Sequence, residues 1–278
     1  MSPAKDPAAP FPEAAPPDAA LASRLADLVE RYERPAFIGE DPISIPHAFE
    51  SPADREVAGL FAAVLAWGRR AIMLAKLAEL MERMEYQPAR FVRTASAASA
   101  SEALGGFKHR TFTTGDAVSL TLAVRAVLER HGSLGALFAS GLRDGVPHIG
   151  PALQTFSDTL LTILPGTPER MRKHLARPGT GSACKRLAMY ARWMVRPGPV
   201  DLAVWPEVPR SKLLLPLDVH TGRQARRLGL LDRTYDDWRA TLELTAVCRA
   251  MDPEDPAKYD YALFGMGVYE DGPLPADA

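Results

Sequence analysis

Apolar residues recur every three to four positions along most of the chain, which is the spacing of one buried helix face. Leu21, Leu25 and Leu28, for example, share one face of a segment that ends at Tyr32. Runs of β-branched residues are absent, and glycines and prolines mark the joints. The pattern predicts an all-α fold of about ten helices. Two of these helices lie within 52–84, one on each side of a break at 67–70. We place the others at 21–32, 116–131, 148–164, 168–175, 182–195, 218–228, 235–251 and 256–268.

The two ends of the chain lack this pattern. Residues 1–20 are nearly all Ala, Pro or charged, so they offer no face that could pack. We expect disordered tails at 1–20 and 271–278, around one helical domain at 21–270. The N-terminus has no basic region followed by an apolar stretch, and no apolar run reaches about 18 residues. We therefore expect a cytoplasmic protein with neither a secretory signal nor a membrane span.

The composition excludes several kinds of site. The 278 residues include only two cysteines, Cys184 and Cys248, too few for a disulfide framework, a four-cysteine zinc site or an iron–sulfur cluster. The six histidines show no spacing typical of metal ligands. We therefore expect no metal, no iron–sulfur cluster and no other cofactor.

Charge is unevenly distributed along the chain. The formal net charge is −1, yet residues 170–233 carry 14 Lys and Arg against four Asp and Glu, a local balance of +10. A basic segment within a nearly neutral protein is typical of a site for a polyanion such as DNA. The alternative is that these charges lie around helix surfaces and are balanced by acidic neighbours.

The sequence Arg177-Pro-Gly-Thr-Gly-Ser182 precedes a predicted helix. Two glycines separated by one residue allow a tight turn, and free backbone N–H groups before a helix suit a phosphate. We predict that this hairpin contacts DNA through Gly179, Thr180, Gly181 and Ser182. An ordinary turn between two helices would have the same sequence.

An apolar run, Leu214 to Leu217, leads directly to Asp218 and a basic helix that includes Arg223. One interpretation of Asp218 is a helix N-cap, whose carboxylate accepts hydrogen bonds from backbone N–H groups. The other is a carboxylate at the mouth of a cleft. Both remain open from the sequence alone.

Taken together, the Gly-x-Gly turn, the helix containing Lys185 and the Pro-Leu-Asp-Val-His segment resemble the helix-hairpin-helix DNA glycosylases. The matching lysine and aspartate are Lys185 and Asp218, which lie 33 positions apart. This gap is similar to that of the archaeal 8-oxoguanine glycosylase branch. Residues 35–270 also resemble a bacterial family without assigned function, through the segments 181–187, 216–221 and 259–265.

The hairpin departs from the pattern of the glycosylases in two ways. It begins with Arg177, where an apolar residue is usual, and Lys185 follows Gly181 by four positions instead of two. Either the second helix begins later in this chain, or Lys185 is not the nucleophile.

The resemblance implies a two-lobed helical fold with a cleft and excision of a damaged base from double-stranded DNA, an oxidised purine being favoured. Lys185 would attack the sugar and allow β-elimination, and Asp218 would stabilise positive charge on the sugar. We expect these two side chains to lie roughly 3–7 Å apart. The base pocket would use Asp260, Tyr261 and Phe264, and further DNA contacts would come from Arg69, Arg70, Arg186 and Arg223.

Two other functions fit the same sequence. A DNA-binding module that has kept the scaffold and lost catalysis fits the displaced lysine. A helical interaction protein that binds no nucleic acid fits the overall charge of −1. For the favoured function we expect a monomer associated with the nucleoid.

Overall fold

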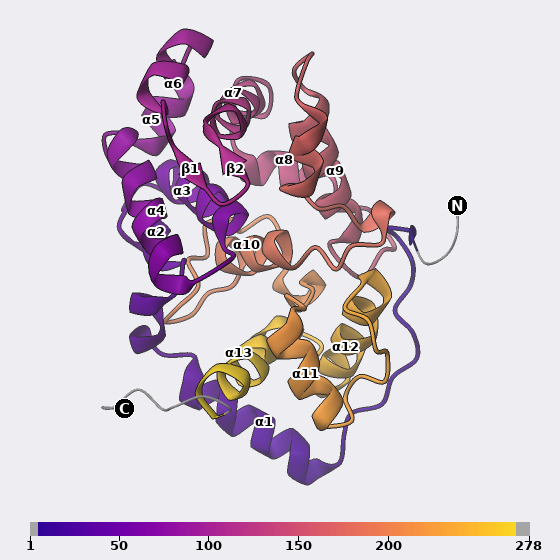
Figure 1. Ribbon diagram of the computed structural model, residues 1–278. Coiled ribbons are helices and arrows are strands. Elements are labelled where there is room, and N and C mark those ends of the chain that lie inside the picture. Colours follow the sequence, from indigo (N-terminus) through magenta and orange to yellow (C-terminus); the bar gives the residue numbers. More distant parts are fainter. Residues whose placement is uncertain (1–4, 271–278) are drawn as a thin grey trace.

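The computed structural model describes residues 5–270 and is mostly helical, which confirms the all-α prediction (Figure 1). The α-helices are α1 (Ala19–Tyr32), α2 (Ser44–His47), α3 (Pro52–Leu65), α4 (Arg70–Arg83), α5 (Pro88–Thr94), α6 (Ala97–Ala103), α7 (Thr114–His131), α8 (Leu134–Ser140), α9 (Gly150–Thr162), α10 (Lys185–Val195), α11 (Val219–Arg227), α12 (Trp238–Met251) and α13 (Tyr259–Gly265). Short 3-10 helices cover Pro35–Glu40, Glu169–Lys173, Pro178–Thr180, Arg210–Lys212 and Pro256–Lys258, and a π-helix covers Met266–Glu270.

Helix α10 separates two groups of helices (Figure 1). Helices α3–α9 lie on one side of it, and α1, α11, α12 and α13 lie on the other, which is the two-lobed arrangement expected from the sequence. In the second group α1 packs directly on α13. A Cβ atom at Gly265 of α13 would lie 2.3 Å from Cδ2 of Tyr32, so this close approach requires glycine.

Helix α3 anchors the other side of α10. Its residues Glu56–Leu65 are all buried, and it packs along α10. The Tyr190 hydroxyl donates a hydrogen bond of 2.9 Å to the carbonyl of Glu56. Gly59 faces the same helix, since a Cβ atom there would lie 3.2 Å from the Tyr190 ring. These contacts fix the position of α10, which carries Lys185 at its first residue.

A small antiparallel sheet was not predicted. Strands β1 (Lys108–His109) and β2 (Phe112–Thr113) pair Lys108 with Thr113 and His109 with Phe112. Two-residue strands are too short to produce a periodic signal in the sequence. Thr113 then caps α7, together with Asp116, in reciprocal hydrogen bonds.

The prediction of a disordered N-terminal tail is wrong for residues 5–18. The Trp238 indole donates a hydrogen bond of 2.9 Å to the carbonyl of Asp6, and Nε2 of His148 lies 2.8 Å from the carbonyl of Ala9. The Phe11 ring packs against His148 at 4.9 Å. Buried donors of the domain therefore hold this segment through its backbone, which composition does not reveal. Residues 1–4 and the predicted tail at 271–278 lie outside the described residues.

Burial of His174 predicts a loss of stability in mild acid. Its ring packs against Phe112, and burial lowers the pKa of His174 to about 4, although Asp116 opposes this effect. The pKa is about 6.5 in the unfolded chain, so the unfolded state binds the extra proton first. The contribution of His174 to stability should be complete above pH 6.5 and should fall by about 3 kcal/mol as the pH drops to 4, whereas Asp260, with its raised pKa, contributes with the opposite sign.

Urea unfolding at a series of pH values measures this loss. His174→Asn should flatten the decline between pH 6.5 and 4, because the variant has no ring to protonate. His131→Asn, which removes a partly exposed histidine, serves as the control and should keep the decline of the wild-type protein. Equal slopes for wild type and His174→Asn would contradict the prediction.

Candidate functional site

Lys185 is the first residue of α10, which answers the question raised by its spacing from Gly181. Cys184 takes a left-handed conformation with φ 54° and acts as the N-cap, so the helix begins at Lys185. Ser182 pairs with Asp237 in an isolated β-bridge before that. The extra residues form this bridge and turn, and the helix indeed begins later than in the glycosylase pattern. Burial raises the pKa of the Cys184 thiol to about 12, which does not suit a nucleophile.

Asp218 is a helix N-cap, which is the first of the two roles that the sequence left open. As N-cap of α11, its Oδ1 accepts hydrogen bonds of 2.9 Å from the backbone N–H groups of His220 and Thr221. Its Oδ2 lies 3.5 Å from Nζ of Lys185, which confirms the predicted distance. The two side chains are 21% and 26% exposed, so a ligand can reach the pair.

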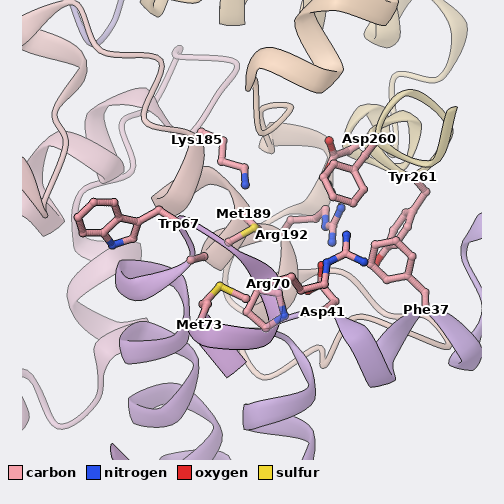
Figure 2. A pocket seen from close by; sticks show the side chains of 14 residues that line it. Phe37, Asp41, Trp67, Arg70, Met73, Lys185, Met189, Arg192, Asp260 and Tyr261 are labelled. Atoms are coloured by element: carbon pink, nitrogen blue, oxygen red, sulfur yellow. Dashed lines mark hydrogen bonds and ion pairs between the residues drawn. The ribbon is translucent and has the colours of Figure 1, made fainter. Parts of the chain in front are cut away.

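A cavity of about 120 Å³ begins beside Lys185. This is far more than the roughly 10–15 Å³ that one water molecule needs. Figure 2 shows Lys185 reaching into this space from α10, with Asp260 and Tyr261 on the α13 side. Phe264 also lines it, so all three predicted pocket residues face one cavity with Lys185. The remaining lining comes from 37–42, 66–73 and two further residues of α10.

Asp260 is the buried acid of this cavity. Its Oδ2 lies 2.5 Å from Nη1 of Arg192, and the Thr221 hydroxyl is 3.5 Å from its Oδ1. Burial raises the pKa of the Asp260 carboxyl to about 6; Arg192 and Lys185 lower it, whereas the charge of Asp218 raises it further. The three groups Lys185, Asp218 and Asp260 therefore influence one another electrostatically.

The sequence analysis missed Asp41 and Arg192. Asp41 follows the 3-10 helix Pro35–Glu40, its Oδ1 accepts a hydrogen bond from the Ile43 amide, and burial raises the pKa of its carboxyl. As an acid before Pro42 it is typical of an ordinary turn, and nothing local links it to Lys185. The sequence does contain a signal for Arg192, because this charged residue interrupts the apolar pattern of α10, in which Leu187–Val195 are all buried.

A buried ion-pair network holds these acids in place. Asp201 lies 3.4 Å from Arg192 and 2.5 Å from Arg196. Arg196 also lies 2.9 Å from Glu33, at the end of α1, and 2.8 Å from Asp255, which precedes α13. Removing one member of such a network would leave a buried charge without a partner, which costs free energy of folding. Each member therefore helps to hold the others in position. The network thus ties the end of α1 and the segment before α13 to α10.

The hairpin does not present the free amides that the sequence predicted. The Gly179 amide donates to the Gln154 side chain at 2.8 Å, the Thr180 amide to the Arg177 carbonyl, and the Gly181 amide to the Pro178 carbonyl. The Ser182 hydroxyl accepts a hydrogen bond from the Cys184 amide. The amides of Gly179, Thr180 and Gly181 are satisfied inside the protein and are not open phosphate donors, so the prediction is wrong for these three residues, whereas contact of DNA with Ser182 stays a prediction.

The predicted DNA-contacting arginines separate into three groups. Arg186 donates to the backbone carbonyls of Val64 and Lys173, so its role is structural, contrary to the prediction. Arg70 lines the cavity and pairs with Glu40 at 3.2 Å. Arg69, at the N-cap of α4, and Arg223, on α11, are exposed.

The basic segment is much less positive in the folded protein than its balance of +10 suggests. Six of its arginines form ion pairs with acids outside residues 170–233, as the alternative interpretation proposed. These pairs are Arg170–Asp116, Arg177–Asp158, Arg192–Asp260, Arg196–Asp255, Arg226–Asp236 and Arg233–Asp237.

The part of the chain from 5 to 270 offers neither a metal site nor a membrane-spanning helix. No group of three or more His, Cys, Asp or Glu side chains in this range could hold a metal ion. No helix within it combines the length and apolar character that crossing a membrane requires.

Comparisons with known proteins give one match. Neither a curated protein nor a solved structure matches the chain. Residues 41–269, which include every residue of the cavity except Phe37, match the family described as protein of unknown function (DUF2400). Because this match covers more than half of the chain, the protein belongs to the DUF2400 family.

Proposed function

We propose that this protein is a DNA glycosylase that excises a damaged or modified base through Lys185 and Asp218. The observation that carries the proposal is the 3.5 Å separation of Nζ of Lys185 and Oδ2 of Asp218 beside a cavity with aromatic walls. An enzyme that acts on a base in duplex DNA must hold the base outside the stack, and a cavity next to the reacting groups serves this purpose.

The two side chains supply complementary chemistry. The bond from C1′ to the base breaks first and its electron pair leaves with the base, and Lys185 then passes a proton to Asp218 as its amine forms a bond to C1′ of the sugar. Asp218 also stabilises the positive charge that develops on the sugar. The lysine adduct opens to a Schiff base, from which β-elimination cleaves the strand.

Exposed residues near the cavity suit contact with a duplex. Arg69 and Arg223 offer positive charge to phosphates from α4 and α11. Ile72 and Val219, on the same two helices, are 51% and 62% exposed, which is unusual for apolar side chains of this size. Such side chains can fill the gap that a displaced base leaves in the stack. We propose that the protein acts in this way as a monomer on chromosomal DNA in the cytoplasm.

A panel of labelled duplexes tests the function. Each duplex carries one lesion, such as 8-oxoguanine, an alkylated purine, uracil or an abasic site, and an undamaged duplex is the control. We expect excision of at least one damaged base and no excision from the control. Binding without excision of any lesion would favour a non-catalytic DNA-binding module, and the absence of binding would favour an interaction protein.

A further inference from the structure

Every cation that lines the cavity already has a carboxylate partner. Arg70 lies 3.2 Å from Glu40, Lys185 lies 3.5 Å from Asp218, and Arg192 lies 2.5 Å from Asp260. Asp41 lines the same cavity, yet within residues 5–270 no Lys or Arg forms an ion pair with it. Among the described residues, the Ile43 amide alone donates a hydrogen bond to the Asp41 carboxylate, at 3.0 Å.

The wider cluster around the cavity contains more acids than bases. Four cations form ion pairs with six carboxyl groups, and the carboxyl group of Asp41 lines the cavity as a seventh. The cations are Arg70, Lys185, Arg192 and Arg196, and the six paired acids are Glu33, Glu40, Asp201, Asp218, Asp255 and Asp260. A carboxylate removed from water is costly unless positive charge or hydrogen bonds compensate it. Burial accordingly raises the pKa of both Asp41 and Asp260, although the charges of Arg192 and Lys185 lower both.

The other walls of the cavity suit a flat, positively charged ring. Phe37 and Phe264 line it and meet edge to face, with centroids 6.0 Å apart. Met73 and Met189 add polarizable sulfur atoms. Aromatic faces attract cations through their quadrupole, and the attraction strengthens when the cation is removed from water.

We propose that the cavity selects a base that carries a formal positive charge, and that Asp41 is its counter-ion. This inference rests on the proposed function. In DNA the corresponding substrate is an N-alkylated purine such as 7-methylguanine, whereas the resemblance found in the sequence favours a neutral oxidised purine. When the bond to C1′ breaks, its electron pair neutralises the charged ring, so the base departs without a proton donor. The nucleophile is the Lys185 amine, whose proton passes to Asp218.

A matched pair of duplexes tests this selectivity. One carries 7-methylguanine and the other 8-oxoguanine, two purines of similar shape that differ in charge. Under single-turnover conditions we expect 7-methylguanine to be excised about tenfold faster or more, the ratio that one partly desolvated charge contact supplies. Asp41→Asn should lower the ratio of the two rates about tenfold, since Asn keeps the oxygen that accepts the Ile43 amide and loses only the charge, while the weaker bond of the charged base is unchanged.

Asp6→Asn is the control for this substitution. Asp6 accepts a hydrogen bond from the amide two residues ahead, as Asp41 does, but it does not line the cavity. This variant should keep the preference of the wild-type protein. Equal rates for the two lesions in wild type, faster excision of 8-oxoguanine, or a ratio of rates that Asp41→Asn leaves unchanged would overturn the inference while leaving the proposed function intact.

If no lesion is excised, the proposed function fails and the cavity is tested by binding alone. Isothermal titration compares 1-methyladenosine, a cation at neutral pH, with neutral adenosine. We expect the cation to bind about tenfold more tightly, and Asp41→Asn to remove the difference. Equal binding of the two nucleosides, or binding of neither, would overturn the proposed selectivity as well.

Discussion

Replacing Lys185 with Gln is expected to abolish the covalent protein–DNA adduct that borohydride traps on a damaged duplex. The wild-type Schiff base is reduced to a stable amine, whereas a glutamine amide cannot form it. The trapped fraction should fall by roughly a thousandfold or more, to the limit of detection, because loss of a covalent nucleophile removes the whole reaction route. Duplex affinity should change little, since one charge among many phosphate contacts contributes little.

Lys173→Gln is the matched control, because it removes an exposed lysine from the same basic segment. It should leave the adduct at the wild-type level. Base excision that persists in Lys185→Gln but is lost in Asp218→Asn would identify water as the nucleophile and contradict the proposed lyase step.

Replacing Asp218 with Asn is expected to slow base excision by about 10²–10⁴-fold, as measured under single-turnover conditions. The substitution removes the Asp218 carboxylate, which stabilises the sugar in the transition state and accepts the Lys185 proton. Asn retains the oxygen that accepts the His220 and Thr221 amides, and it is as good an N-cap as Asp. Loss of activity should therefore occur without loss of helix α11.

The control is Asp237→Asn, which changes another N-cap aspartate that pairs with an arginine, Arg233. The midpoint of thermal unfolding of Asp237→Asn should shift about as much as that of Asp218→Asn. The excision rate of Asp237→Asn should stay at the wild-type level. A rate for Asp218→Asn within about threefold of wild type would contradict the catalytic role, since groups of this kind contribute far more.

The sequence predicted those features that depend on local pattern. The break at 67–70 separates α3 from α4, and helix α7 ends at His131, before Gly132, as expected. Asp218 is the helix N-cap that the sequence around it predicted. Lys185 and Asp218 also lie within the predicted distance, but this expectation came from the resemblance to the glycosylases, because local signals operate over a few residues and the two positions are 33 apart.

The remaining features depend on contacts between distant segments. Asp41 and Asp260 lie 219 positions apart in the sequence, and only folding brings them to the same cavity. The charge of residues 170–233 was misjudged for the same reason, since the acids that pair with Arg192 and Arg196 come from α13, the segment before it and the end of α1. The residues that neighbour Arg192 and Arg196 in the sequence do not indicate which acids will pair with them.

The packing of α1 on α13 has a consequence for synthesis on the ribosome. Leu25, Leu28, Val29 and Tyr32 form the buried face of α1, and α13 covers it. Roughly 230 residues separate the two helices, which corresponds to roughly 10–50 s of elongation at about 5–20 residues per second. Throughout this interval the nascent chain exposes an apolar helix face that invites aggregation or chaperone binding. Asp260 also arrives with α13, so the walls of the cavity are complete only after α13 has been synthesised.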